Sequence, residues 1–108
     1  MRMWMISPHL LCRKHLLGEH VEIHMLCGAM QGGKSLAGHL ERGQLEPQNA
    51  QRRHLELVVE MARRGYNHRS PLPIVHVRPH QHGYVNAEQS QLDLIARCPD
   101  CRARAEES

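Results

Sequence analysis

Three ionisable side chains near the start of the chain are spaced to share one face of a helix. His15, Glu19 and Glu22 follow one another at intervals of four and three residues, and Gly18 falls on the same face. A carboxylate beside an imidazole can carry out general acid and base catalysis, and a glycine one turn away would let a substrate backbone come close. A charged face of this kind is also typical of an ordinary solvated helix. The spacing therefore gives Glu22 as a candidate acid or base and leaves the surface-helix interpretation open.

The cysteines offer a second kind of chemistry. Cys98 and Cys101 form a Cys-x-x-Cys pair, which has the spacing of half a zinc site. Any further ligands would have to come from elsewhere in the chain: Cys12, Cys27, His76, His80 or His82. One pair alone also fits two free thiols near a helix end. His20 and His24, four residues apart, are compatible with a metal too, although a split between core edge and surface is the commoner arrangement.

Residues 28–35 match the phosphate-binding pattern G-x-x-x-x-G-K-S letter for letter, with Lys34 in the lysine position. That pattern works only between a buried strand and a helix of a parallel sheet. The residues before it have helical rather than strand periodicity. We therefore interpret the glycines as a helix exit and keep a nucleotide-binding P-loop only as the weakest alternative.

The elements that position these groups are predicted to be helices. The chain has 108 residues, no Phe, one Trp and two Tyr, which favours an all-α single domain over residues 1–108. Helical periodicity predicts one helix from about residue 10 or 12 to 30, a second from about 46 to 64, and a third from about 87 that Pro99 kinks or ends. One helical turn is expected within 35–40, a Pro/His-rich ordered loop over 66–83 with a short extended piece at 74–77, and a frayed C-terminal tail.

The charge pattern permits an anionic partner. The formal net charge is +3, and the arginines fall in pairs, which predicts a basic face or, with equal weight, an ordinary solvated surface. His54 and His68 could contact phosphate, while the scarcity of aromatic residues disfavours a single-strand binder that stacks bases. The short apolar start is interrupted before it could form a signal or a membrane span, so we expect a cytoplasmic protein with reduced or metal-bound cysteines.

Together these residues resemble the pyrimidine-dimer DNA glycosylase/AP lyase family of the phage UV endonuclease V type, especially its short phage and bacterial variants. The resemblance runs through His15-Leu16, Glu19 to Glu22 and Gly28-Ala29, and resumes at Glu56-Leu57 and Arg64-Gly65-Tyr66-Asn67, with a weaker echo over 90–99. It implies a compact three-helix protein whose N-terminal segment threads between the helices.

The resemblance implies that the α-amine of Met1 attacks the sugar C1′ to form a Schiff base, while Glu22 drives the proton steps. Retention of Met1 is expected because Arg2 is bulky. An ordinary α-amine has a pKa of about 8, so a usable fraction is free base near neutral pH, unlike a lysine. His15 and Glu19 would orient Glu22 or its water. The expected DNA contacts are Arg2, His15, Glu19, Arg52, Arg53, Arg63 and Arg64.

The predicted function is an N-glycosylase with AP lyase activity on damaged duplex DNA, at pyrimidine dimers or abasic sites. It would need no cofactor, could carry a structural zinc, and would act as a monomer away from membranes. The family's phosphate-binding arginines correspond to Val21 and approximately to Met25, and its aromatic tail is replaced by the Cys-x-x-Cys segment, which leaves the preferred lesion open. A small zinc-stabilised DNA-binding protein without catalysis is the main alternative.

Overall fold

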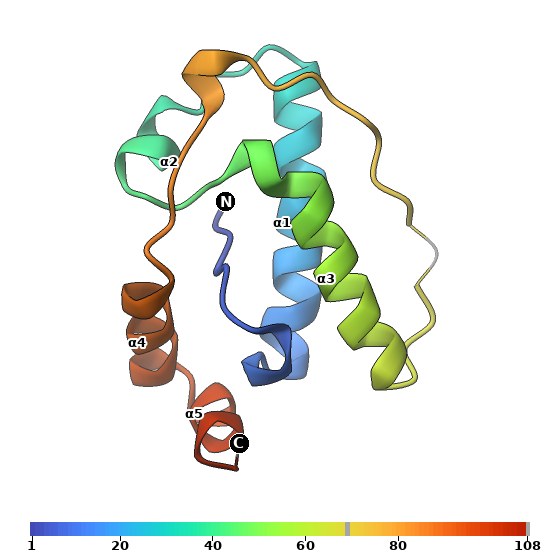
Figure 1. The fold of residues 1–108 in the computed structure, drawn as a ribbon, viewed down its shortest axis with the longest axis vertical. Coiled ribbons are helices and arrows are strands. Elements are labelled where there is room, and N and C mark those ends of the chain that lie inside the picture. The colour runs from blue at the N-terminus through green and yellow to red at the C-terminus, as the bar shows by residue number, and fades with distance from the viewer. Residues whose placement is uncertain (69, 108) are drawn as a thin grey trace.

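Two long helices, α1 (Arg13–Gln31) and α3 (Ala50–Arg63), pack against each other at the centre of the protein (Figure 1). The computed structural model describes residues 1–68 and 70–107. The buried face of α1 carries Leu16, Ile23, Leu26, Cys27 and Met30, which includes most of the stripe predicted from periodicity. The helix ends where Gly33 adopts a φ of 70°, a left-handed conformation that glycine adopts without strain. The predicted first and second helices are therefore confirmed.

Three further helices complete the chain: α2 (Ala37–Glu41), α4 (Ala87–Arg97) and α5 (Pro99–Glu107). Across residues 1–68 and 70–107 there are five helices and no strand, so the all-α prediction is confirmed and the extended piece expected at 74–77 is not a strand. That stretch belongs to a long loop, and among the loop residues that the structure describes a 3-10 helix forms at Pro79–Gln81. The prediction of three helices is too low.

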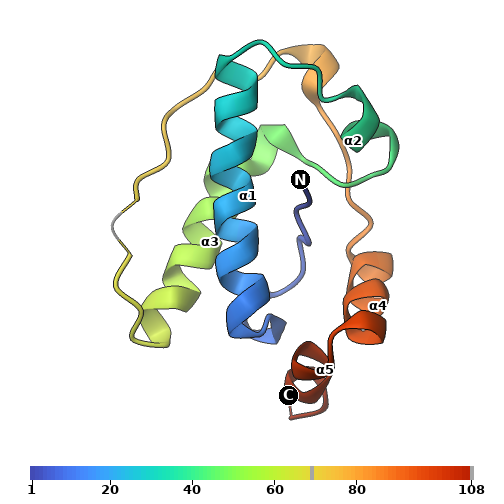
Figure 2. The same ribbon diagram turned by 180° about the vertical axis from the view of Figure 1, so that it is seen from behind.

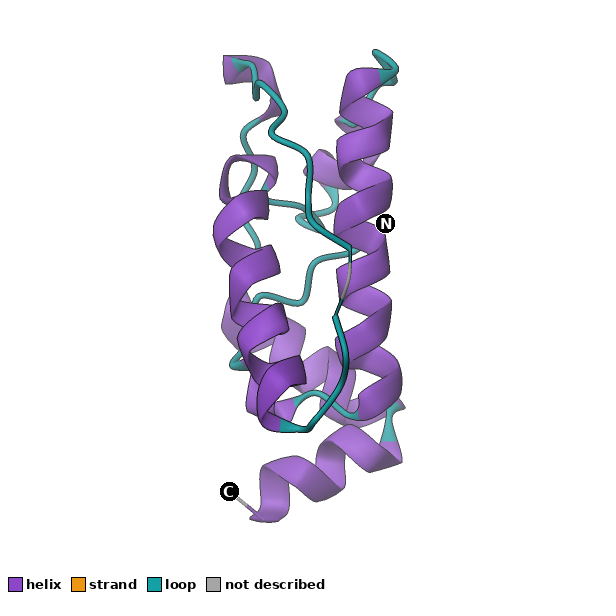
Figure 3. Ribbon diagram, turned by 90° about the vertical axis from the view of Figure 1, so that its right-hand side faces the viewer, coloured by secondary structure: helices purple, strands orange, loops and turns teal. Residues whose placement is uncertain are grey.

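The C-terminal tail, expected to fray, is helix α5, which lies across one end of the molecule (Figure 3). The backbone of Cys98 is extended between the two helices, and Pro99 begins α5, because a proline fits the first helical turn. The only buried side chain described in α5 is Cys101. A helix with one buried residue leaves no apolar periodicity, which is why sequence pattern did not predict it.

The N-terminal segment runs between the helices, with its first residue between α1 and α4 in projection (Figures 1 and 2). The backbone N–H of Met3 donates to the Gln44 carbonyl at 2.8 Å, and Ser90 Oγ of α4 donates to the Trp4 carbonyl at 2.7 Å. Met3, Trp4 and Ile6 are buried in the core. The segment is thus held by both halves of the chain. No described helix is long and apolar enough to cross a bilayer.

Candidate active site

Glu22 of α1 receives the N-terminal segment directly. The backbone N–H of Arg2 donates a 3.0 Å hydrogen bond to Glu22 Oε2. Met1 is half-buried against the core. Because one residue spans at most about 3.6 Å, the α-amine of Met1 lies no further than one residue's reach from the amide that Glu22 accepts. An amine and a carboxylate at this spacing can share the work of nucleophilic attack and proton transfer.

A cavity of about 320 Å³ opens beside Glu22. It is lined by Arg2, Trp4, Lys14, His15, Gly18, Glu19, Glu22 and Arg97. A Cβ atom added at Gly18 would meet nothing within 4 Å, so the protein itself does not need a glycine there. The absent side chain leaves free space in the wall of the cavity, as the sequence-based argument for Gly18 requires.

Positive side chains surround this cavity. The Arg2 guanidinium lies 4.0 Å from the centre of the Trp4 ring and forms a 3.1 Å ion pair with Asp93 of α4. Arg97 lies 5.6 Å from the same ring. Sequence reasoning predicted Arg2 as a DNA contact but not Lys14 or Arg97, because no local pattern indicates that α4 reaches the start of the chain. The resulting cationic rim suits a phosphodiester backbone.

Glu19 faces a different partner from Glu22. Arg53 of α3 donates to both oxygens of Glu19, at 2.6 and 3.0 Å, and also to the Ile6 carbonyl at 2.7 Å. Both charged side chains are almost completely buried. Burial opposes ionisation of Arg53, but the hydrogen bond and charge of Glu19 outweigh it and raise the Arg53 pKa. Glu19 and Arg53 were expected to contact DNA; the structure places both in a buried ion pair that joins α1 to α3, and the DNA contact stays a prediction.

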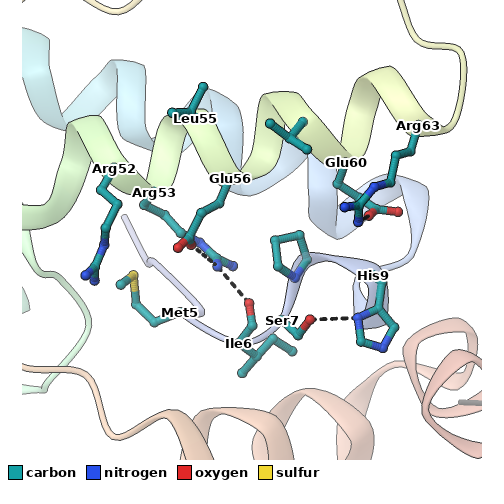
Figure 4. Close-up of a pocket in the computed structure, with 12 residues that line it drawn as sticks. Met5, Ile6, Ser7, His9, Arg52, Arg53, Leu55, Glu56, Glu60 and Arg63 are labelled. Carbon is teal, nitrogen blue, oxygen red and sulfur yellow. Dashed lines mark hydrogen bonds and ion pairs between the residues drawn. The ribbon is translucent and has the colours of Figure 1, made fainter.

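The remaining predicted arginines lie along α3. Arg64 donates to Glu60 at 2.8 Å and to the Leu11 carbonyl at 2.7 Å, so it is largely occupied. Arg52 and Arg63 are exposed and line a separate cavity of about 570 Å³ between α3 and residues 5–9 (Figure 4). Glu22 does not line that cavity, so the structure does not gather these arginines at the carboxylate.

Cys98 and Cys101 lie beside Cys12 and His15, which are at the N-terminal end of α1. The Cys12 sulfur lies 3.2 Å from His15 Nδ1 and 3.8 Å from the Cys98 sulfur, and the Cys101 sulfur lies 3.6 Å from His15 Nδ1. The four ligand atoms all lie within 4.8 Å of one another, so this Cys3His cluster could hold a zinc ion. Of the further ligands considered from sequence, only Cys12 belongs to it.

The thiols of the cluster are in unequal environments. Burial raises the pKa of Cys101 to about 12. Burial also disfavours the Cys98 thiolate, but hydrogen bonds from the Cys101 backbone and from neighbouring thiols outweigh it and lower the Cys98 pKa. His15 has a second neighbour, because its ring packs edge-on against Trp4 with centroids 5.8 Å apart. His15 therefore links the cluster to the cavity beside Glu22.

The P-loop alternative is wrong. Gly28 lies inside α1, and the described residues contain no strand to precede it. The amides that would surround a phosphate instead close the helix: the N–H of Gly33 donates to Met30 and that of Lys34 donates to Ala29. The glycines form a helix exit, as the preferred interpretation stated.

Comparison with known proteins identifies one family. A family model described as pyrimidine dimer DNA glycosylase matches residues 1–73, well over half of the chain. No curated protein and no solved structure matches. The matched range contains Met1, Glu22 and Arg53, whereas α4, α5 and the Cys-x-x-Cys pair lie beyond it.

Proposed function

Because the chain belongs to the pyrimidine dimer DNA glycosylase family, we propose that it removes damaged bases from duplex DNA and then cleaves the strand as an AP lyase. The observation that carries the proposal is the 3.0 Å hydrogen bond between the Arg2 backbone and Glu22, beside a cavity walled by cationic side chains. It supports Met1 as the nucleophile and Glu22 as the acid and base.

In the proposed reaction the α-amine of Met1 attacks C1′ while the C1′–N bond to the damaged base breaks. Loss of the amine proton and opening of the sugar ring give an imine between Met1 and the sugar. The Glu22 carboxylate stabilises the cationic sugar and then removes a C2′ proton, so that the C3′–O bond breaks and the 3′ phosphate leaves. Water finally hydrolyses the imine and restores the amine.

Binding of the duplex is assigned to the cations that line the two cavities. Arg2, Lys14 and Arg97 border the cavity that would receive the damaged nucleotide, and Arg52 and Arg63 extend the positive surface along α3. Extruding a nucleotide costs a few kcal/mol and is easiest where the lesion already weakens pairing. The buried Trp4 ring supports the cavity wall, because the Arg2 guanidinium lies over it. We expect the protein to act as a monomer.

We also assign a structural zinc ion to Cys12, His15, Cys98 and Cys101. Four protein ligands leave no open position for a substrate, which is typical of structural rather than catalytic zinc. The ion would join the start of α1 to the α4–α5 junction and fix the His15 ring beside the cavity. No step of the reaction passes through it.

Reductive trapping tests the function directly. The protein is incubated with abasic or UV-irradiated duplex and borohydride, and peptide mapping by mass spectrometry locates the adduct. We expect it on the α-amine of Met1, and intact mass shows whether Met1 is retained. Acetylation of the N-terminus should abolish trapping and leave DNA binding. An adduct on a lysine would overturn the assignment of the nucleophile.

The same assay separates the alternative function. A zinc-stabilised DNA-binding protein without catalysis, which the Cys3His cluster would also suit, would bind duplex and form no adduct. Binding without trapping or cleavage on both substrates would therefore favour that alternative.

A further inference from the structure

Four histidines form a cluster that includes no residue of the cavity beside Glu22 and none used in the proposed reaction. His20 and His24 come from α1, His54 from α3, and His68 from the loop that follows α3. The His20 ring lies with its centroid 4.8 Å from His24, 4.9 Å from His54 and 4.8 Å from His68. Sequence reasoning held His20 and His24 compatible with a metal but more often divided between core edge and surface, and allowed His54 and His68 to contact phosphate. They form a single cluster instead.

The cluster leaves polar atoms without partners. The Nε2 atoms of His20, His24, His54 and His68 are all buried, and none has a hydrogen-bond partner among the described residues. Buried polar atoms in proteins are nearly always paired, and four unpaired nitrogens in one place require a common explanation. A ligand that accepts electron pairs from all of them would provide one.

The geometry suits a metal ion. Ligand nitrogens of His20, His54 and His68 lie within 4.8 Å of one another. Zinc–nitrogen bonds of about 2.1 Å place tetrahedral ligand atoms about 3.4 Å apart, so small inward rotations of the rings would close the site. His24 packs on His20 and on His54, at 4.8 and 5.3 Å between centroids, and can supply the fourth nitrogen.

The hydrogen bonding of His54 leaves one ring nitrogen available to a metal. The His54 ring hydrogen-bonds to the Ser70 backbone. Because His54 Nε2 has no partner, that hydrogen bond involves Nδ1, and a ring that donates Nδ1–H keeps its Nε2 lone pair free.

We propose that His20, His24, His54 and His68 form a second metal site with only imidazole ligands, suited to a divalent first-row cation such as Zn²⁺. Imidazole nitrogen binds zinc, copper, nickel and cobalt, and four such ligands make a closed, structural site. The ion would fasten α1 to α3 and to the loop beyond α3. It shares no ligand with the Cys3His cluster, so both sites can be filled in one chain.

A cobalt titration of the intact chain distinguishes the two sites. The protein is stripped with a chelator, kept reduced, and titrated with Co²⁺ while its visible spectrum is recorded. Thiolate ligands give a sulfur-to-cobalt charge-transfer band, whereas an imidazole-only tetrahedral site gives only ligand-field bands. We expect two equivalents of Co²⁺ per chain, with the charge-transfer band belonging to only one of them. Saturation at a single equivalent that carries the thiolate band would overturn the proposal.

Variants assign the nitrogen-only site to its residues. His68→Gln changes a loop residue and should lose one equivalent of metal while keeping the charge-transfer band; His54→Gln should do the same if it folds. Cys98→Ser should show the reverse, losing the band and keeping the nitrogen-only site. His76→Gln, an exposed histidine in the same loop, is the matched control and should keep both equivalents. Unchanged stoichiometry in His68→Gln, with the ligand-field spectrum also unchanged, would contradict the assignment.

Discussion

Glu19 and Glu22 lie one helical turn apart on α1 and serve different partners: Glu19 is buried on Arg53, while Glu22 accepts the backbone N–H of Arg2. From spacing alone the two carboxylates form a pair on one face. In the structure Glu19 forms the buried ion pair that joins α1 to α3, which leaves Glu22 as the carboxylate of the proposed chemistry. Substitutions at the two positions should therefore have separable effects.

Replacing Glu22 with Gln should abolish strand cleavage without unfolding the protein. Gln keeps the size and the hydrogen bond from Arg2 but cannot take up a proton, and loss of a general base typically lowers a rate by about 10²–10⁴-fold. Cleavage of an abasic duplex is measured beside thermal unfolding and DNA affinity, both of which should stay near wild type. A cleavage rate within twofold of wild type would sink the assignment of Glu22.

Replacing Arg53 with Met should destabilise the fold. It leaves the Glu19 carboxylate buried without its partner, a change that typically costs about 3–5 kcal/mol. Denaturant unfolding gives the difference in free energy. The double variant Glu19→Leu with Arg53→Met should recover much of the loss, because no buried charge is left unpaired and Glu56, the other partner of Arg53, is 43% exposed. If Arg53→Met were as stable as wild type but weaker in DNA binding, Arg53 would be a DNA contact after all.

Replacing Gly18 with Ala should raise stability and lower activity at once. Ala is favoured over Gly inside a helix by about 0.5–1 kcal/mol, and the added Cβ meets no protein atom within 4 Å. The methyl group would instead project into the space beside Glu22 that the substrate needs. Gly28→Ala is the matched control, since it lies on the same helix with equally open space and outside that cavity. Equal cleavage rates for the two variants would show that Gly18 is not at the substrate.

Removing zinc should loosen the C-terminal helices. A chelator is expected to lower the melting temperature of the wild type, and to lower that of Cys98→Ser by less, because that variant has already lost a ligand of the Cys3His cluster and keeps only the proposed histidine site. Cys27→Ala is the control, since Cys27 is a buried thiol outside the cluster. If the chelator lowered the melting temperature of Cys98→Ser as much as that of the wild type, the stabilising ion would lie elsewhere, and the histidine cluster would be the site to test.

Introducing arginine at Val21 should strengthen DNA binding. Val21 is 54 % exposed and adjoins Glu22, at the position where the family resemblance places a phosphate-binding arginine. One additional phosphate contact should steepen the slope of log DNA-binding constant against log salt concentration by about 0.9. Ile74→Arg, in an exposed loop position, controls for the added charge alone. An equal gain in both variants would mean that the effect is one of net charge and not of position.

Helices with a continuous apolar face could be predicted from the spacing of apolar residues in the sequence. Leu16, Ile23 and Met30 on α1 recur at helical spacing, so the helix and its buried side could be predicted from the sequence. Helix α5 could not, because Cys101 is the only one of its described side chains that is buried. Propensity and periodicity report only neighbours in sequence.

Contacts between residues far apart in the sequence could not be predicted from periodicity either, because periodicity reports only neighbours in sequence. Arg53 was predicted as a surface cation, and nothing within its own helix marks Glu19 as its partner across the core. The zinc ligands show the opposite case: the Cys-x-x-Cys spacing indicated half a site, and Cys12 was considered for the remainder. His15 could not be predicted as the fourth residue of the cluster, because its spacing placed it on the helix face of Glu22.

The hydrogen bond from Ser90 to the Trp4 carbonyl and the ion pair of Asp93 with Arg2 join α4 to the very start of the chain. The proposed reacting groups and the helix that holds them in place are therefore encoded in different stretches: Met1 and Glu22 fall within the range matched by the family model, and α4 lies outside it. Changes confined to the C-terminal stretch would alter how firmly the N-terminus is held without replacing either proposed reacting group.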